Sequence, residues 1–196
     1  MDTMRILITG VGGQGNLLAS RLLGEAAMAE DIPVRVSEVH GMAQRGGVVE
    51  STVMLGGLES PIISAGQADV LLGFEPLETL RALSRCSKES MVITNINPIV
   101  PFTVELGQAE YPDVDQWLAF MKENFAGFLA VDADALAREA GTPKAVNVVM
   151  LGALIGTGKV PMSRQVMEET IKRVVKPKFV EPNLKAFGLG FEAAAS

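Results

Sequence analysis

The sequence predicts an α/β protein with one open, mostly parallel sheet, flanked by helices and followed by a C-terminal helical arm. Short apolar runs rich in β-branched residues alternate with segments of helical periodicity along most of the chain. A glycine-rich turn joins the first apolar run to the first periodic segment. The 196 residues, of which 48% are hydrophobic, are enough to bury one core.

The expected elements of the first half follow in chain order. Residues 5–10 form a short apolar run that ends in glycine, which is typical of a buried parallel strand. Leucines and alanines at helical spacing predict a helix over 16–30. The pair Glu75-Pro76 favours a helix start, because proline fits the first turn of a helix. The other elements expected here are strands at 32–39, 48–56, 68–74 and 90–95 and a helix at 75–86.

The second half begins with an excursion at 96–116, which is rich in prolines and turn residues. The segment 145–158 is apolar nearly all round and predicts a buried helix. Residues 1–175 are expected to form one α/β domain, and 176–196 a C-terminal arm that docks on it or on a partner. Gly141 is expected to end a helix at 133–141, and Ser163 to cap the start of a helix at 163–175. The remaining elements expected are a strand at 126–133 and a helix at 116–125.

Composition excludes several classes of function. The net charge of −6 argues against non-specific nucleic-acid binding and against a polybasic membrane patch. The N-terminus does not resemble a signal peptide, and no apolar stretch is long enough to span a bilayer, so a cytoplasmic location is expected. With Cys86 and His40 as the only residues of their kinds, neither a cysteine-bound cluster nor a metal site is expected.

The glycine-rich turn is the first candidate binding site. Its spacing is Gly-x-Gly-x-x-Gly, placed between a predicted strand and a predicted helix. The helix N-terminus behind such a turn offers free N–H groups and the positive end of a dipole, which favour a phosphate or carboxylate. The alternative is a tight turn that binds nothing. The candidate ligand-binding residues are Gly10, Gly12, Gly13, Gln14 and Gly15.

A second polar segment follows the second predicted strand. Glu38 stands where a Rossmann-like NAD site has its ribose-binding acid, but a dense polar run follows it in place of a variable helix. Because strand ends of a doubly wound sheet face one crevice, this run is expected to converge on the glycine turn. It adds Glu38, Gln44, Gly46 and Gly47 as candidate ligand-binding residues and His40 and Arg45 as weak catalytic candidates.

Arg45 and His40 have specific chemical uses in this segment. A guanidinium beside the backbone N–H groups of two glycines makes an anion clamp, and a histidine can move a proton near neutral pH. The alternative for each is structural: His40 caps a backbone carbonyl, and Arg45 pairs with Glu38 or Glu50.

Taken together, "ITGVGGQG" and "SEVHGMAQRGGVVES" strongly resemble the small subunits of the 2-oxoacid:ferredoxin oxidoreductases. The sequence from His40 to Gly47 resembles the motif of the beta subunit of the indolepyruvate type. The gamma subunits of the pyruvate and 2-oxoglutarate types keep the Arg-Gly-Gly but have a Tyr-Gly-Pro lead-in. The stretches at 68–83 and 145–154 also fit the family, and the resemblance extends to about residue 175.

The resemblance implies a complex that oxidatively decarboxylates an aryl pyruvate. Thiamine diphosphate, iron–sulfur clusters and coenzyme A take part, and ferredoxin receives the electrons. This chain lacks the cysteines and the Gly-Asp-Gly motif for the first two cofactors, so the resemblance places them on a large partner subunit. The chain is then expected to hold no cofactor alone and to be inactive without its partner.

Two alternatives remain open on the residues alone. A free-standing NAD(P)-dependent oxidoreductase explains the glycine turn, but the sole tyrosine, Tyr111, is not part of a Tyr-x-x-x-Lys pair. A non-catalytic module that binds an anion or nucleotide explains the same turn without any reaction.

Overall fold

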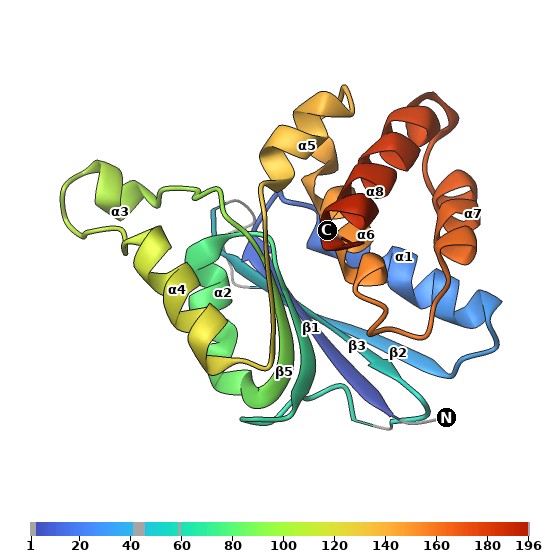
Figure 1. Cartoon of the computed structure of the whole chain (residues 1–196), viewed down its shortest axis with the longest axis horizontal. Helices are drawn as coiled ribbons and strands as arrows, with labels where there is room; N and C mark the ends of the chain where they lie inside the picture. Colours follow the sequence, from blue (N-terminus) through green and yellow to red (C-terminus); the bar gives the residue numbers. More distant parts are fainter. Residues whose placement is uncertain (1–2, 41–45, 59, 196) are drawn as a thin grey trace.

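The computed structural model describes residues 3–40, 46–58 and 60–195. Its centre is one six-stranded sheet (Figure 1), in which the strands follow the order β2-β3-β1-β4-β5-β6. Every strand expected from the sequence is present, which confirms the α/β class. The strands are β1 (Met4–Val11), β2 (Val34–His40), β3 (Val48–Leu55), β4 (Ala68–Gly73), β5 (Cys86–Asn95) and β6 (Gly127–Val131).

The direction of β3 sets the topology of the sheet. Strands β1, β4, β5 and β6 pair in parallel, whereas β3 lies between β1 and β2 and is antiparallel to both. The connection from β2 to β3 covers only 41–47, which is too short for a parallel crossover. The prediction of a mostly parallel sheet is confirmed, with β3 as the reversed strand.

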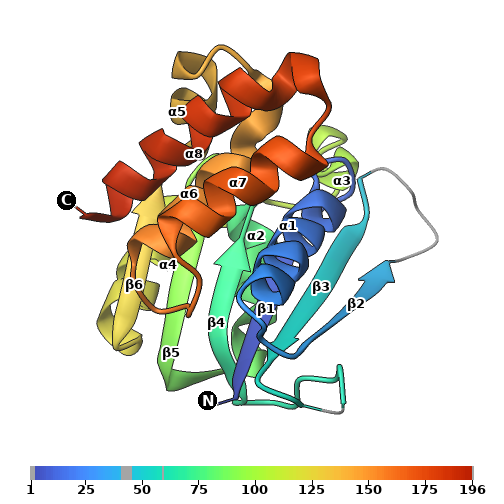
Figure 2. The same ribbon diagram turned by 90° about the vertical axis from the view of Figure 1, so that its right-hand side faces the viewer.

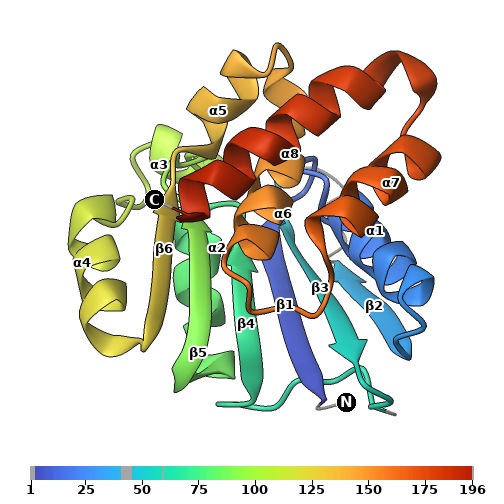
Figure 3. The same ribbon diagram turned by 45° about the vertical axis from the view of Figure 1, so that its right-hand side comes forward.

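Helices cover both faces of the sheet (Figures 2 and 3). The larger core lies under α1 and α6, with α5, α7 and α8 outside them, and a smaller core lies under α2 and α4. The helices are α1 (Asn16–Ala29), α2 (Pro76–Ala82), α3 (Phe102–Glu105), α4 (Val114–Asn124), α5 (Ala133–Glu139), α6 (Val146–Gly156), α7 (Arg164–Val174) and α8 (Val180–Ala195), with 3-10 turns at Leu83–Arg85, Pro143–Ala145 and Pro177–Phe179. No helix in these described ranges is long and apolar enough to cross a bilayer.

The local signals for helix ends act as expected. Glu75 stands directly before Pro76, the first residue of α2. Its carboxylate accepts from the backbone N–H of Glu78 and so caps the helix. The Ser163 hydroxyl accepts from Val166 N–H at 3.2 Å and caps α7. Gly141 has a φ of 86° just after α5, the left-handed conformation that a glycine adopts without strain.

One boundary differs from the expectation. The helix predicted over 75–86 ends at Ala82, and β5 begins at Cys86 rather than at 90. The register of β4 against β5 shifts between Ala68 and Val70, so the polar residues 87–90 form an irregularity inside the strand. Cys86 is half-buried there, and its burial raises the pKa of the thiol to about 11.

Helix α8 lies directly on α6, and glycines make the contact close. A Cβ atom added at Gly190 would collide with the carbonyl oxygen of Val149, and one at Gly152 with the carbonyl oxygen of Phe187. The apolar segment 145–158 therefore forms a helix that is buried from both sides, by the sheet and by α8.

Candidate functional site

The two predicted loops meet at the carboxyl edge of β1. The backbone N–H of Gly12 donates to the carbonyl oxygen of Gly47 at 2.8 Å. This bond joins the turn after β1 to the residues that lead into β3. The convergence expected for these two loops is therefore present for the part of them that the structure describes.

Gln14 fastens the glycine turn to the sheet. Its Oε1 accepts from Val11 N–H at 2.7 Å, and its Nε2 donates to the Phe74 carbonyl at 2.8 Å. Gly10 leaves room for this side chain, because a Cβ there would come within 2.8 Å of Gln14 Oε1. Both ends of the amide serve the turn itself, and a ligand-binding role for Gln14 stays a prediction.

Gly15 shapes the start of α1. Its φ of 88° is in the left-handed region, and no side chain of the described residues caps the helix behind it. Asn147, at the start of α6, donates from Nδ2 to the Gly15 carbonyl at 3.2 Å. Asn147 therefore supports the glycine turn and does not cap its own helix. The first-turn N–H groups of α1, which have no partner within the helix, lie behind this turn.

Asn16 is a buried polar residue that sequence reasoning missed. Its Nδ2 donates to the carbonyl of Val49 on β3 at 2.9 Å, which ties α1 to the reversed strand. Its Oδ1 is buried and has no hydrogen-bond partner among the described residues. The sequence carried no signal for this bond, since the two residues are 33 positions apart.

Glu38 lies on the α1 side of the sheet. Its carboxylate accepts from the Ser20 hydroxyl at 3.1 Å. In a dinucleotide-binding Rossmann fold the ribose-binding acid ends the strand next to β1. Here β3 stands between β1 and β2, so Glu38 is removed from the glycine turn by a whole strand, about 5 Å further than in that fold. The geometry disfavours an NAD site, and the ligand role of Glu38 stays a prediction.

The structure describes only part of the remaining candidate residues in the segment between β2 and β3. The backbone of His40 pairs with Val49 at the end of β2. The side chain of His40 and the residues Gln44 and Arg45 lie outside the described part of the chain. Gly46, with a φ of 75°, and Gly47 are described and adjoin the glycine turn.

A cavity of about 520 Å³ opens beside these glycines. One wall is Val11 with residues 46–48, another is α2, and the third is the excursion at 99–110. The buried carboxylate of Glu75 holds two of these walls together, α2 and the excursion, because it accepts from Ile99 N–H at 3.2 Å and from the Tyr111 hydroxyl as well as capping α2. Sequence reasoning identified Glu75 only as a helix start.

Glu78 is a second buried carboxylate at this cavity and was also missed. Its Oε1 accepts from Arg81 at 2.7 Å, whereas its Oε2 has no partner among the described residues. Burial raises the pKa of this carboxyl group above its ordinary value, Arg81 lowers it, and the nearby charge of Glu75 raises it further.

The Glu78→Gln variant is expected to change how stability depends on pH. In the unfolded chain Glu78 titrates at the ordinary pH of a glutamate carboxyl, which lies below its pKa in the folded chain. The carboxyl's contribution to stability is full below that pH and is lost as the pH rises through the folded pKa. The free energy of unfolding of the wild type should therefore fall relative to Glu78→Gln between pH 4 and pH 8. Loss of the Arg81 ion pair adds an offset of at most about 1 kcal/mol.

Urea denaturation of both proteins at the two pH values measures this difference. Parallel pH profiles for wild type and Glu78→Gln would show that Glu78 titrates alike in the folded and unfolded chains.

Comparison with known proteins identifies the family. The family of pyruvate ferredoxin/flavodoxin oxidoreductases matches residues 5–193. The chain belongs to this family. It is 45% identical to "Indolepyruvate oxidoreductase subunit IorB" of Thermococcus kodakarensis and 46% identical to the protein of that name from Pyrococcus horikoshii, over 99% of this chain and 97% of each relative.

A solved structure of the family has the same fold. The gamma subunit of a keto/oxoacid ferredoxin oxidoreductase from Geobacter sulfurreducens superposes with a TM-score of 0.71 at 26% identity, over 97% of this chain and 98% of that one. The resemblance seen in the two loops is thus confirmed. This member of the pyruvate ferredoxin/flavodoxin oxidoreductase family is a subunit of an oxidoreductase, not a free-standing NAD(P) enzyme.

Proposed function

We propose that the chain is the small, non-cofactor-bearing subunit of an indolepyruvate-type 2-oxoacid:ferredoxin oxidoreductase. A larger subunit carries thiamine diphosphate and iron–sulfur clusters, which supply decarboxylation and electron transfer to ferredoxin, and coenzyme A takes the acyl group. The match to indolepyruvate oxidoreductase subunits over nearly the whole length of both proteins carries this proposal. Indolepyruvate and other aryl pyruvates are the proposed substrates.

The residues of this chain bear on where each cofactor is held. Its single cysteine, Cys86, is half-buried at the start of β5, so the chain does not fit an iron–sulfur cluster, which takes several thiolates. The start of α1, which no described side chain caps and which is reached through Gly12–Gly15, fits a phosphate or carboxylate. An anionic part of coenzyme A or of the oxoacid is the group that these residues would hold.

The contribution of the small subunit is then to close the cleft around substrate or coenzyme A. The Gly12–Gly47 bond joins the glycine turn to the segment that carries Arg45. Arg45 is proposed to meet a carboxylate or phosphate at the active site of the larger subunit, and His40 to hold or move a proton there.

Replacing Arg45 by alanine tests the clamp in the assembled enzyme. We expect the KM for coenzyme A or for the oxoacid to rise about tenfold or more, since a charge-assisted contact to an anion is worth roughly 1.5–3 kcal/mol. Arg35→Ala, on an exposed part of β2, is the matched control and should leave the kinetics unchanged. Unchanged KM values and turnover in Arg45→Ala would remove the proposed role.

Native, oxygen-free purification of the tagged chain from its own host tests the subunit assignment. The expected product is a brown complex with a large second chain, iron and thiamine diphosphate, active on aryl pyruvates. A colourless chain of the expected 20.8 kDa, or a simple homo-oligomer of it, would contradict the assignment.

A further inference from the structure

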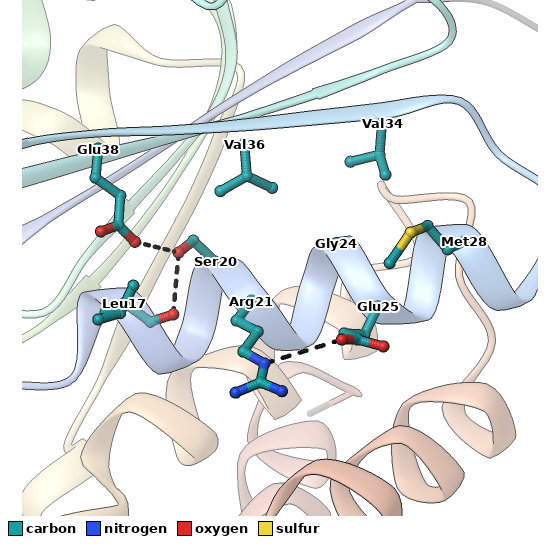
Figure 4. A pocket seen from close by; sticks show the side chains of 9 residues that line it. All are labelled: Leu17, Ser20, Arg21, Gly24, Glu25, Met28, Val34, Val36 and Glu38. Carbon is teal, nitrogen blue, oxygen red and sulfur yellow. Dashed lines mark hydrogen bonds and ion pairs between the residues drawn. The ribbon is translucent and has the colours of Figure 1, made fainter.

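The outer edge of the sheet carries an apolar groove that the proposed function does not use. The groove has a volume of about 350 Å³ and runs between α1 and β2 (Figure 4). Gly24 lets the strand come close, because a Cβ there would lie 3.1 Å from Val36 Cγ2. The apolar walls are open to solvent: Leu17 is 64% exposed, Met28 56% and Val36 41%. Exposed aliphatic side chains gathered in this way are typical of an interaction surface.

The strand beside the groove is also unpaired on one side. β2 is the outermost strand and is hydrogen-bonded only to β3 within the described sheet. Proteins usually protect a free strand edge with charges, prolines or a covering segment, because it invites pairing with another chain. Val36, which lines the groove, and Val39, on the opposite face of the strand, are both exposed. The groove therefore adjoins a strand edge with which no other described strand pairs.

The order of side chains along α1 indicates what covers it. The solvent-facing stripe of the helix consists of Leu17, Arg21, Glu25 and Met28, at spacings of four, four and three residues. Arg21 Nε lies 3.9 Å from Glu25 Oε1, and Arg173 of α7 also contacts Glu25 at 3.3 Å. The charged pair occupies the middle of the stripe, and an aliphatic side chain stands at each end.

This stripe is complementary to its own reverse. When two copies of α1 lie antiparallel about a two-fold axis, Leu17 of one faces Met28 of the other, and Arg21 faces Glu25 in both directions. A two-fold interface requires this kind of self-complementarity, because the same patch must serve both partners. A partner of different sequence would not require the apolar–positive–negative–apolar order to be complementary to its own reverse.

We propose that the α1–β2 groove binds a second copy of this chain through a two-fold, antiparallel α1–α1 contact. Aliphatic ends of one stripe enter the groove of the other copy, and the two Arg21–Glu25 pairs lie across the axis. This proposal does not depend on the ligand roles of the glycine turn or Arg45. The larger subunit is the competing occupant.

Charge reversal separates this contact from a general loss of stability. All charge variants are made in an Arg173→Ala background, because Arg173 contacts Glu25 within the same copy and would repel an arginine there. Arg21→Glu and Glu25→Arg each place like charges across the axis, so each should weaken self-association by tenfold or more. The double variant Arg21→Glu/Glu25→Arg restores opposite charges and should return the dissociation constant close to that of the Arg173→Ala background. Sedimentation equilibrium of the full chain measures all four proteins.

Disulfide trapping tests the geometry directly. Leu17 and Met28 are 11 residues apart in sequence, or about 16 Å along one helix, so cysteines there cannot bridge within one copy. In a Cys86→Ser background, Leu17→Cys/Met28→Cys should form a covalent dimer on oxidation, and either single variant should not.

The proposal fails if the wild-type chain is monomeric at high micromolar concentration. It also fails if the charge variants lose binding to the larger subunit but self-associate as the wild type does, which would assign the groove to the larger subunit. Binding of the same variants to the larger subunit, measured in the native complex, separates the two outcomes. The aryl-pyruvate activity of Arg45→Ala bears only on the proposed function.

Discussion

Gly190→Ala is expected to destabilise the protein by about 3 kcal/mol or more, beyond the usual cost of one extra methyl group in a core. The added Cβ would collide with the Val149 carbonyl, and backbone lies on both sides of the contact. Neither helix can relieve the clash by a rotamer change, so α8 must move away from α6. Urea denaturation monitored by circular dichroism measures the loss.

Gly188→Ala is the matched control for this prediction. It lies on the same helix, where the nearest atom to an added Cβ is Arg164 Nη2 at 3.6 Å, an ordinary contact. Because alanine favours helix over glycine by up to about 1 kcal/mol, this variant should be neutral or slightly more stable. Equal stability for the two variants would contradict the tight α6–α8 packing.

The same pair of variants bears on the proposed division of the chain. We propose that 176–196 acts as an arm docked on the domain formed by 1–175, because α8 covers one side of the apolar helix α6. If α8 contributed nothing to the domain, Gly190→Ala would melt only this arm and would leave the unfolding of the rest unchanged.

Gly15→Ala is expected to cost about 3 kcal/mol in stability and to reduce kcat/KM of the assembled enzyme by tenfold or more. Two separate effects add. The φ of 88° costs an L-residue roughly 1–2 kcal/mol. The new Cβ would also lie 2.5 Å from Asn147 Nδ2, which now holds the Gly15 carbonyl. The glycine turn must shift, and with it the start of α1.

The double variant Gly15→Ala/Asn147→Ala divides the two effects. Removing the Asn147 side chain relieves the clash but not the backbone strain, so part of the stability should return. Asn147→Ala alone should cost about 1 kcal/mol through its lost hydrogen bond. Activity that survives Gly15→Ala undiminished would show that the glycine turn takes no part in the complex's reaction.

Local chemistry explains why many elements could be read from the sequence. Glu75-Pro76, Ser163 and Gly141 act within one helical turn, so the residues themselves indicate where these helices begin or end. The strand–glycine–helix order at 5–30 likewise predicts the first unit of the sheet. The sequences of the two glycine-containing loops were enough to indicate the family.

Contacts between residues far apart in the sequence could not be predicted from these local signals. The fold decides which segments come together. Three features depend on it: the hydrogen bond from Tyr111 to Glu75, the buried Glu78 carboxylate and the bond from Asn16 to Val49. No periodicity or motif encodes these pairs. Sequence reasoning therefore missed the cavity beside the glycines even though it identified the glycines themselves.

The sequence by itself determined the alternation of strands and helices, the glycine turn at the end of β1, and a net charge and cysteine content that exclude several functions. Only the tertiary structure decided that β3 separates Glu38 from that turn, that Asn147 supports Gly15 from 132 residues away, and that the α1 stripe lines an open groove. The first set follows from short-range backbone preferences and composition. The second depends on strand order and helix packing, which are set by the burial of the whole core.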